Sequence, residues 1–109
     1  MSARLPEPLA AYFTAKNKHD IDAMLAPFSE DAVIKDEGQE RRGLAAIREW
    51  MEETTRKYRV TVEVRDVAEA HGKAVVTGLV SGNFPGSPAE LRYAFTLDGG
   101  KVAHLEIGR

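Results

Sequence analysis

The order of patterned segments along the chain predicts an α+β fold, in which helices cover one concave face of a curved antiparallel sheet. Apolar residues recur at helical spacing in three segments of the first half, whereas later segments alternate apolar and polar side chains. Turn-forming residues separate these segments. Two independent cores would each be too small in a chain of 109 residues, so a single domain over residues 1–109 is expected.

Three helices are expected before the long strands. The first covers about 7–18, and Asp20 is a suitable N-cap for a short second helix. Gly43 opens a third helix that ends near Tyr58. The apolar stripes at helical spacing are Leu9, Tyr12 and Phe13, then Ile21, Met24, Leu25 and Phe28, and finally Leu44, Ile47 and Met51 with Trp50 beside them.

The strands are predicted from alternation and turn signals. A short strand at 32–35 ends on the turn-forming group that begins with Asp36. The valines at 60, 62 and 64 alternate with polar residues and predict a strand with one buried face, followed by a more apolar strand at 74–81. Residues 91–97 and 102–107 form a hairpin across the Asp98-Gly99-Gly100 turn, and Pro85 and Pro88 keep the intervening loop out of the sheet.

Composition excludes several classes of function. Fifteen basic residues are dispersed among 17 acidic ones, so the positive field that nucleic-acid binding requires is missing, and Arg41-Arg42 is expected in a solvated loop. No apolar run is long enough to span a bilayer, and the first eight residues lack a secretory signal. A cytoplasmic location is therefore expected. The absence of cysteine excludes disulfides and thiolate catalysis.

No metal site and no cofactor are expected. His19, His71 and His104 are far apart in the sequence and lack a metal-binding spacing. The alternation of the last strand places His104 on the outer face of the sheet, where it could contact a second copy. The glycine-rich turn at 98–101 joins two strands, whereas a phosphate-binding loop opens a helix.

Four segments together resemble the nuclear transport factor 2-like superfamily, in particular its ketosteroid isomerase-like and SnoaL-like branch. They are LAAYF at 9–13, HDIDAM at 19–24, FSEDAV at 28–33 and RGLAAI at 42–47. The resemblance extends over essentially the whole chain. It implies a cystatin-like fold in which three N-terminal helices and a cone-like curved sheet enclose a pocket.

The resemblance also implies roles for individual residues. In ketosteroid isomerase, an aspartate is the general base, and a tyrosine and a protonated aspartate bind the oxyanion. Asp36 matches the base and Tyr12 matches the phenol. Tyr93 stands where the isomerase has its protonated acid, and Phe28 and Met51 replace the tyrosines that support the phenol. These departures count against steroid isomerisation itself.

The expected activity is proton transfer next to a carbonyl, in an isomerase, cyclase or lyase. The ligand would be a small apolar or carbonyl-containing molecule, with Asp36 as base and Tyr12 as oxyanion donor. The side chains expected to line its pocket are Trp50, Tyr93, Phe95, Leu105 and Phe28.

Several alternatives remain open at this stage. Asp36 could be an ordinary turn acid, Tyr12 could be a core aromatic residue, and the domain could bind a ligand or partner protein without catalysis. Epoxide hydrolysis would need a pocket arginine, for which the candidates are Arg48, Arg92 and Arg109. A homodimer through the outer face of the sheet is expected if valines there are partly exposed, the candidates being Val60, Val62, Val64, Val75 and Val80.

Overall fold

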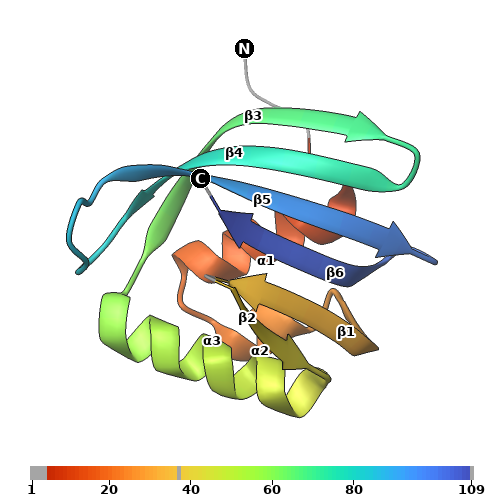
Figure 1. Cartoon of the computed structure of the whole chain (residues 1–109), viewed down its shortest axis with the longest axis horizontal. Helices are drawn as coiled ribbons and strands as arrows, with labels where there is room; N and C mark the ends of the chain where they lie inside the picture. Colours follow the sequence, from red (N-terminus) through yellow and green to blue (C-terminus); the bar gives the residue numbers. More distant parts are fainter. Residues whose placement is uncertain (1–4, 37, 109) are drawn as a thin grey trace.

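The computed structural model describes residues 5–36 and 38–108 and confirms the predicted fold class (Figure 1). Two helices come first, as expected from the sequence, but the strand predicted at 32–35 spans Phe28–Asp36 and is therefore a long strand that precedes the third helix. Phe28, which was assigned to the apolar stripe of the second helix, begins this strand instead. In chain order the elements are α1 (Glu7–Asn17), α2 (Ile21–Leu25), β1 (Phe28–Asp36), β2 (Gln39–Arg42), α3 (Leu44–Tyr58), β3 (Thr61–Ala70), β4 (Lys73–Ser81), β5 (Ala89–Asp98) and β6 (Lys101–Gly108).

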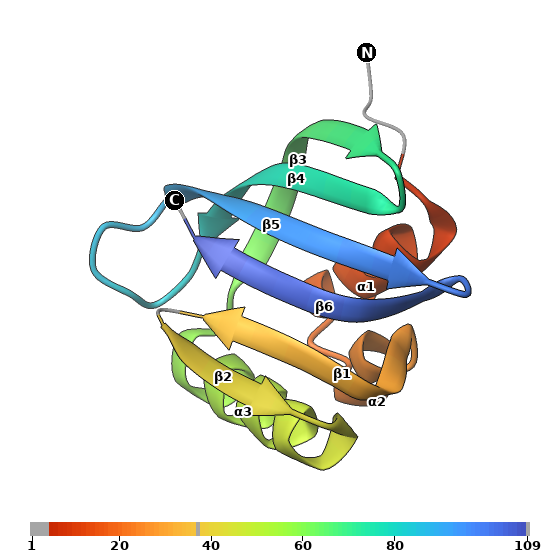
Figure 2. The same ribbon diagram turned by 45° about the vertical axis from the view of Figure 1, so that its right-hand side comes forward.

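The six strands form one sheet in the order β2-β1-β6-β5-β4-β3. All neighbouring pairs are antiparallel except β1 and β6, which run side by side in the same direction (Figure 2). The expectation of a wholly antiparallel sheet is thus wrong for this pair. The chain leaves β1 through β2 and α3 and builds the sheet from its far edge, so the last strand arrives beside the first.

Strand β2 was not predicted, and Arg41 and Arg42 lie in it rather than in a loop. Its sequence, QERR, has no apolar alternation, because no side chain of this edge strand is buried. Backbone pairing holds it in place, with Val33 opposite Arg42 and Asp36 opposite Gln39. An edge strand made of charged residues is a common protection against association with other chains.

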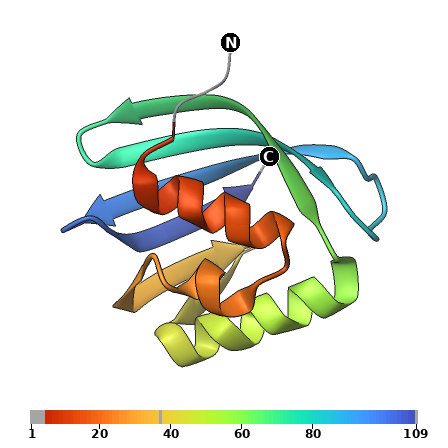
Figure 3. The same cartoon turned by 180° about the vertical axis from the view of Figure 1, so that it is seen from behind.

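The helices cover one face of the sheet, with α1 and α2 lying across it and α3 running along the edge near β1 and β2 (Figure 3). The predicted N-cap is confirmed, because the side chain of Asp20 accepts a hydrogen bond from the Ala23 amide. Helix α1 is tied to β3 by Asn17, whose Oδ1 accepts from the Val62 amide at 2.7 Å and whose Nδ2 donates to the Val62 carbonyl at 3.0 Å. This amide pairing fixes the position of α1 over the sheet.

Irregular pairing shapes two strands. The pairing of β3 with β4 shifts between Val64 and Asp66, and Gly78 lies opposite Val64. A Cβ atom at Gly78 would lie 2.6 Å from Cγ1 of Val62, so only glycine fits there.

A second shift, in the pairing of β5 with β6, puts Val102 in the core although it is two residues from His104 and would share its face in a regular strand. His104 is half-buried and pairs with Thr96.

The register of the strands decides which of the five candidate valines are exposed on the outer face. Val62 and Val80 are buried in the core, and Val60 and Val64 are half-buried against it. Val75 alternates with the buried Ala74 and Val76, so it projects from the opposite, outer face and is 38% exposed. The expectation of exposed valines therefore holds for Val75. None of the helices within the described ranges has the length and hydrophobicity needed to cross a bilayer.

Candidate functional site

Asp36 ends β1 on the concave face of the sheet. Its pairing partner on β6 is Ile107, which in turn pairs with Tyr93 on β5. Because paired residues on neighbouring strands project to the same face, Asp36 and Tyr93 belong to one row of inward-facing side chains. Asp36 is half-buried and Tyr93 is 2% exposed, so the carboxylate stands at the margin of the core and the phenol inside it.

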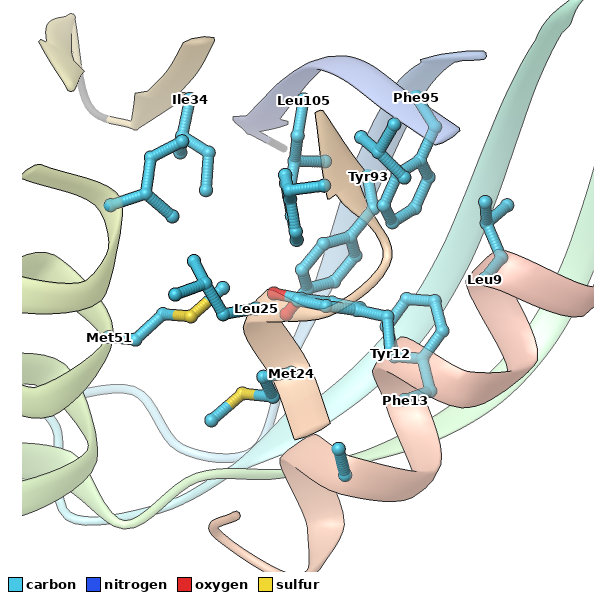
Figure 4. Close-up of a cluster of buried hydrophobic side chains, with 14 of the residues drawn as sticks. Leu9, Tyr12, Phe13, Met24, Leu25, Ile34, Met51, Tyr93, Phe95 and Leu105 are labelled. Carbon is cyan, nitrogen blue, oxygen red and sulfur yellow. The ribbon is translucent and has the colours of Figure 1, made fainter. Parts of the chain in front are cut away.

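Tyr12 reaches this face from α1 and is completely buried. Its ring packs edge-on against the rings of Phe13, Phe28 and Phe95, with centroids 5.1–5.7 Å apart. Figure 4 shows the hydroxyl oxygens of Tyr12 and Tyr93 on the same side of this cluster, the side of Leu25 and Met51. The Tyr12 hydroxyl finds no hydrogen-bond partner among the described residues. A buried hydroxyl in this condition needs an explanation, because nearly all such groups are satisfied.

Burial and the negative charge of Asp36 both raise the pKa values of the two phenols. Burial raises the pKa of Tyr12 well above its usual value, and the neighbouring Tyr93 and the charge of Asp36 raise it further. Burial and, to a smaller extent, Asp36 also raise the pKa of Tyr93 above its usual range. Both side chains therefore stay protonated at neutral pH and can donate hydrogen bonds to an acceptor.

Lys16 belongs to the same site and was missed by the sequence analysis. Among the described residues it is the only buried one with a charged side chain, at 8% exposure. Its Nζ lies 5.7 Å from the ring centroid of Tyr12. Burial lowers the pKa of Lys16 to about 8, and the charge of Asp36 opposes this fall. Its position four residues after Tyr12, on the buried face of α1, was the available signal.

Comparison with known proteins places this site in a family context. The family model described as "SnoaL-like domain" matches residues 9–105. The chain belongs to the SnoaL-like domain family. A candidate polyketide cyclase from Sinorhizobium meliloti has a solved structure that superposes with a TM-score of 0.91, at 39% identity over 94% of both chains.

Two further solved structures share the fold of this SnoaL-like domain. A candidate polyketide cyclase from Pseudomonas putida is 25% identical over 95% of this chain and 90% of its own, with a TM-score of 0.82. A protein with a ketosteroid isomerase-like fold from Catenulispora acidiphila, crystallised with trimethylamine, is 18% identical, with coverage of 97% and 87% and a TM-score of 0.85. Curated protein sequences gave no match.

The side chains expected to line the pocket of the SnoaL-like domain come together in its core. Trp50, Phe28, Phe95 and Leu105 are all buried in the cluster that holds Tyr12 and Tyr93. The surface of the described part of the chain has open hollows, two of which border α2. One runs along α1 and α2, the other lies between α2, β1 and α3, and neither is lined by Asp36 or Tyr12. A pocket at the phenols therefore stays a prediction.

The arginines considered for epoxide hydrolysis lie away from this site. Arg48 forms an ion pair of 2.7 Å with the exposed Asp22, and Arg92 is exposed and pairs with Thr77 on the outer face. Arg109 is outside the described residues. Lys16 is the cation near the phenols instead. Within the ranges 5–36 and 38–108, no three His, Cys, Asp or Glu side chains gather as a metal ion would require.

Proposed function

We propose that this SnoaL-like domain is an enzyme of the cyclase or isomerase type, which moves a proton next to the carbonyl of a small apolar substrate. The observation that carries the proposal is the buried Tyr12 hydroxyl, which has no partner among the described residues and shares its surroundings with the carboxylate of Asp36. The Tyr12 hydroxyl can therefore donate a hydrogen bond to an oxygen atom of a substrate, while the nearby carboxylate of Asp36 accepts a proton from the same molecule.

In the proposed reaction, a carboxylate oxygen of Asp36 takes the proton from the carbon next to the carbonyl. The electron pair of that C–H bond forms the C=C bond of an enolate, and the carbonyl electron pair moves to oxygen. Tyr12 donates a hydrogen bond to this oxygen, and Tyr93 is a second phenol at the same face. Return of the proton to another carbon gives an isomer. Attack of the enolate carbon on a second carbonyl instead forms the C–C bond of a ring, and the electron pair of that carbonyl moves to its oxygen, which takes the proton back from Asp36.

The different burial of the phenols and of Asp36 supports the phenols as hydrogen-bond donors and Asp36 as the base. Both phenols keep their protons at neutral pH, because burial raises their pKa values. A hydrogen bond from a buried phenol to a developing oxyanion is strongest where water is excluded. Asp36 is only half-buried, so it retains the access that a base needs to exchange its proton with solvent.

Exchange of carbon-bound hydrogen tests the proposal without knowledge of the natural substrate. Small cyclic ketones and 1,3-diketones are incubated with the protein in deuterated water, and incorporation of deuterium beside the carbonyl is followed by NMR. Asp36→Asn keeps the size of the side chain but removes the proton acceptor, so exchange should fall by about two to four orders of magnitude. Asp31→Asn, an exposed position on the same strand, is the matched control.

The outcomes separate catalysis from binding alone. Exchange that is catalysed by the wild-type protein and the Asp31→Asn variant but lost with Asp36→Asn supports the proposal. Equal exchange with Asp36→Asn contradicts the role of this residue. Ketone binding, seen as shifts of protein NMR signals, without catalysed exchange would favour a non-catalytic binding module of the same fold.

A further inference from the structure

We propose that Lys16 determines which ligands this chain accepts, by making the site around Tyr12 bind acidic oxygen compounds as their anions, that is, as enolates or phenolates. This inference deepens the proposed function and rests on it.

Lys16 occupies a position where a lysine is unusual. It lies on the face of α1 that carries Leu9, Tyr12 and Phe13, all of which are buried. Lysines at such positions usually extend their stem along apolar surface and keep the ammonium in water. Here the whole side chain is only 8% exposed, and this burial lowers the pKa of Lys16 to about 8. Lys18, two residues later on the same segment, is exposed and shows the ordinary arrangement.

Two of the described residues act on this ammonium, one on the same helix and one on the sheet. On α1, its Nζ lies 5.7 Å from the centroid of the Tyr12 ring. The charge that acts on it from the sheet is that of Asp36 on β1, which favours the protonated form of Lys16. Among the described residues, Tyr93 on β5 is another titratable group of this face, and burial keeps it neutral. The charge of Asp36 offsets only part of the effect of burial on the ammonium, since the pKa of Lys16 remains lowered.

A ligand oxygen with a negative charge would improve this balance. An enolate or phenolate placed at the Tyr12 hydroxyl would accept the hydrogen bond that this hydroxyl does not make among the described residues. It would also supply a second negative charge near the ammonium, in a region where charges interact strongly. In the proposed reaction, this charge appears only after the substrate proton has passed to Asp36, so Lys16 would favour the enolate over the ketone.

The class of ligand follows from these donors. A simple ketone gains little from the ammonium, whereas a cyclic 1,3-dicarbonyl compound or an acidic phenol loses its proton readily and places a charged oxygen at the site. The surrounding wall of Phe28 and Phe95 rings suits a flat, apolar ring. The site would thus select small, flat, acidic carbonyl or phenol compounds over neutral ones.

The test uses 4-nitrophenol, because its phenolate absorbs at a longer wavelength than the neutral phenol. The full chain is titrated with this probe, and the absorption of the bound form shows whether a proton has been lost. The wild-type protein should bind the phenolate. Lys16→Met should weaken phenolate binding by about tenfold or more and shift the bound probe toward the neutral phenol, because a nearby opposite charge is removed. Lys18→Met is the matched control and should bind as the wild type does.

Two further variants keep the test decisive. Lys16→Gln retains a polar side chain and should lose phenolate binding as Lys16→Met does, while circular dichroism shows that both variants are folded. Asp36→Asn should tighten phenolate binding, because a repelling carboxylate is removed. If both Lys16 variants bind the phenolate as the wild type does, or if the wild type binds the neutral phenol, the role of Lys16 is overturned. Either result leaves the proposed function of Asp36 and Tyr12 untouched. Failure of the probe to bind in either form counts against the proposed ligand site and overturns the inference with it.

Discussion

The Nζ of Lys16 lies 5.7 Å from the ring centroid of Tyr12, one helical turn earlier on α1. The two residues are buried side by side although each carries a polar group that favours water, and each therefore costs stability where it stands. Both reach the concave face of the sheet on which Asp36 lies. Groups that cost stability and meet at one place are typical of functional sites.

The buried ammonium predicts how stability depends on pH. The pKa of Lys16 is about 8 in the folded chain and 10.5 when it is not perturbed, so between these values the unfolded chain binds more protons. The free energy of unfolding should therefore rise with pH above about 8, by at most about 1.4 kcal/mol per pH unit. The tyrosines act in the opposite direction above their usual pKa of 10.0, because their raised pKa values keep them protonated only in the folded chain.

Urea denaturation over a series of pH values checks this expectation. The wild-type protein should gain stability from pH about 8 to about 10 and lose it above that range. Lys16→Met should abolish the rise and keep the fall, whereas Lys18→Met should behave as the wild type does. A flat wild-type profile between these values would mean that the ammonium of Lys16 is hydrated.

The Tyr12 hydroxyl predicts opposite effects on stability and function. Tyr12→Phe removes a buried polar group that has no partner among the described residues, and the apolar ring remains. The free energy of unfolding should stay the same or rise by about 1 kcal/mol. Deuterium exchange into ketones and phenolate binding should both weaken, because the hydrogen bond to the ligand oxygen is lost.

Tyr58→Phe provides the matched control for this variant. Tyr58 is half-buried on α3 and packs edge-on against Phe84, with ring centroids 6.4 Å apart, away from the aromatic cluster of Tyr12. Its substitution should change neither exchange nor phenolate binding. A Tyr12→Phe variant that is clearly less stable than the wild type would show that the hydroxyl has a structural role.

The sequence predicted those features that depend on local pattern. The stripe of Leu9, Tyr12 and Phe13 located α1, and the Asp98-Gly99-Gly100 turn located the hairpin of β5 and β6. The resemblance to a known family proposed Asp36 and Tyr12, and the register places Asp36 on the concave face that Tyr12 reaches from α1. Their catalytic roles stay predictions.

The features that were not predicted depend on contacts between distant parts of the chain. The parallel pairing of β1 with β6 joins segments about seventy residues apart, and no local pattern encodes it. Strand β2 has only charged and polar residues, so its pairing leaves no periodic signal. Lys16 was not predicted as a site residue, because its spacing from Tyr12 only places it on one face of α1 and the packing of this helix against the sheet buries the side chain.

The outer face of the sheet carries charged side chains of both signs, including Arg92 and Glu106 near its centre. At its centre Val75 pairs with Ala68 on one side and Ala94 on the other. At one end of this face, Glu63 and Glu90 lie on either side of Leu79, with which both pair. At the other end, Lys73 and His104 lie on either side of Thr96 in the same way. Two copies related by a two-fold axis across the strands would place the acidic end of one against the basic end of the other.

We therefore expect a homodimer in which the outer faces pack together around Val75, the large apolar residue that is exposed among the described residues. Val75→Glu would bury a carboxylate between the copies without altering the core, since the side chain projects away from it. Sedimentation equilibrium at micromolar concentration should show a dimer for the wild type and a monomer for Val75→Glu. Ala45→Glu, an exposed position on α3, controls for the added charge and should remain dimeric. A monomeric wild type would exclude this interface, and a dimeric Val75→Glu variant would place the interface elsewhere on the molecule.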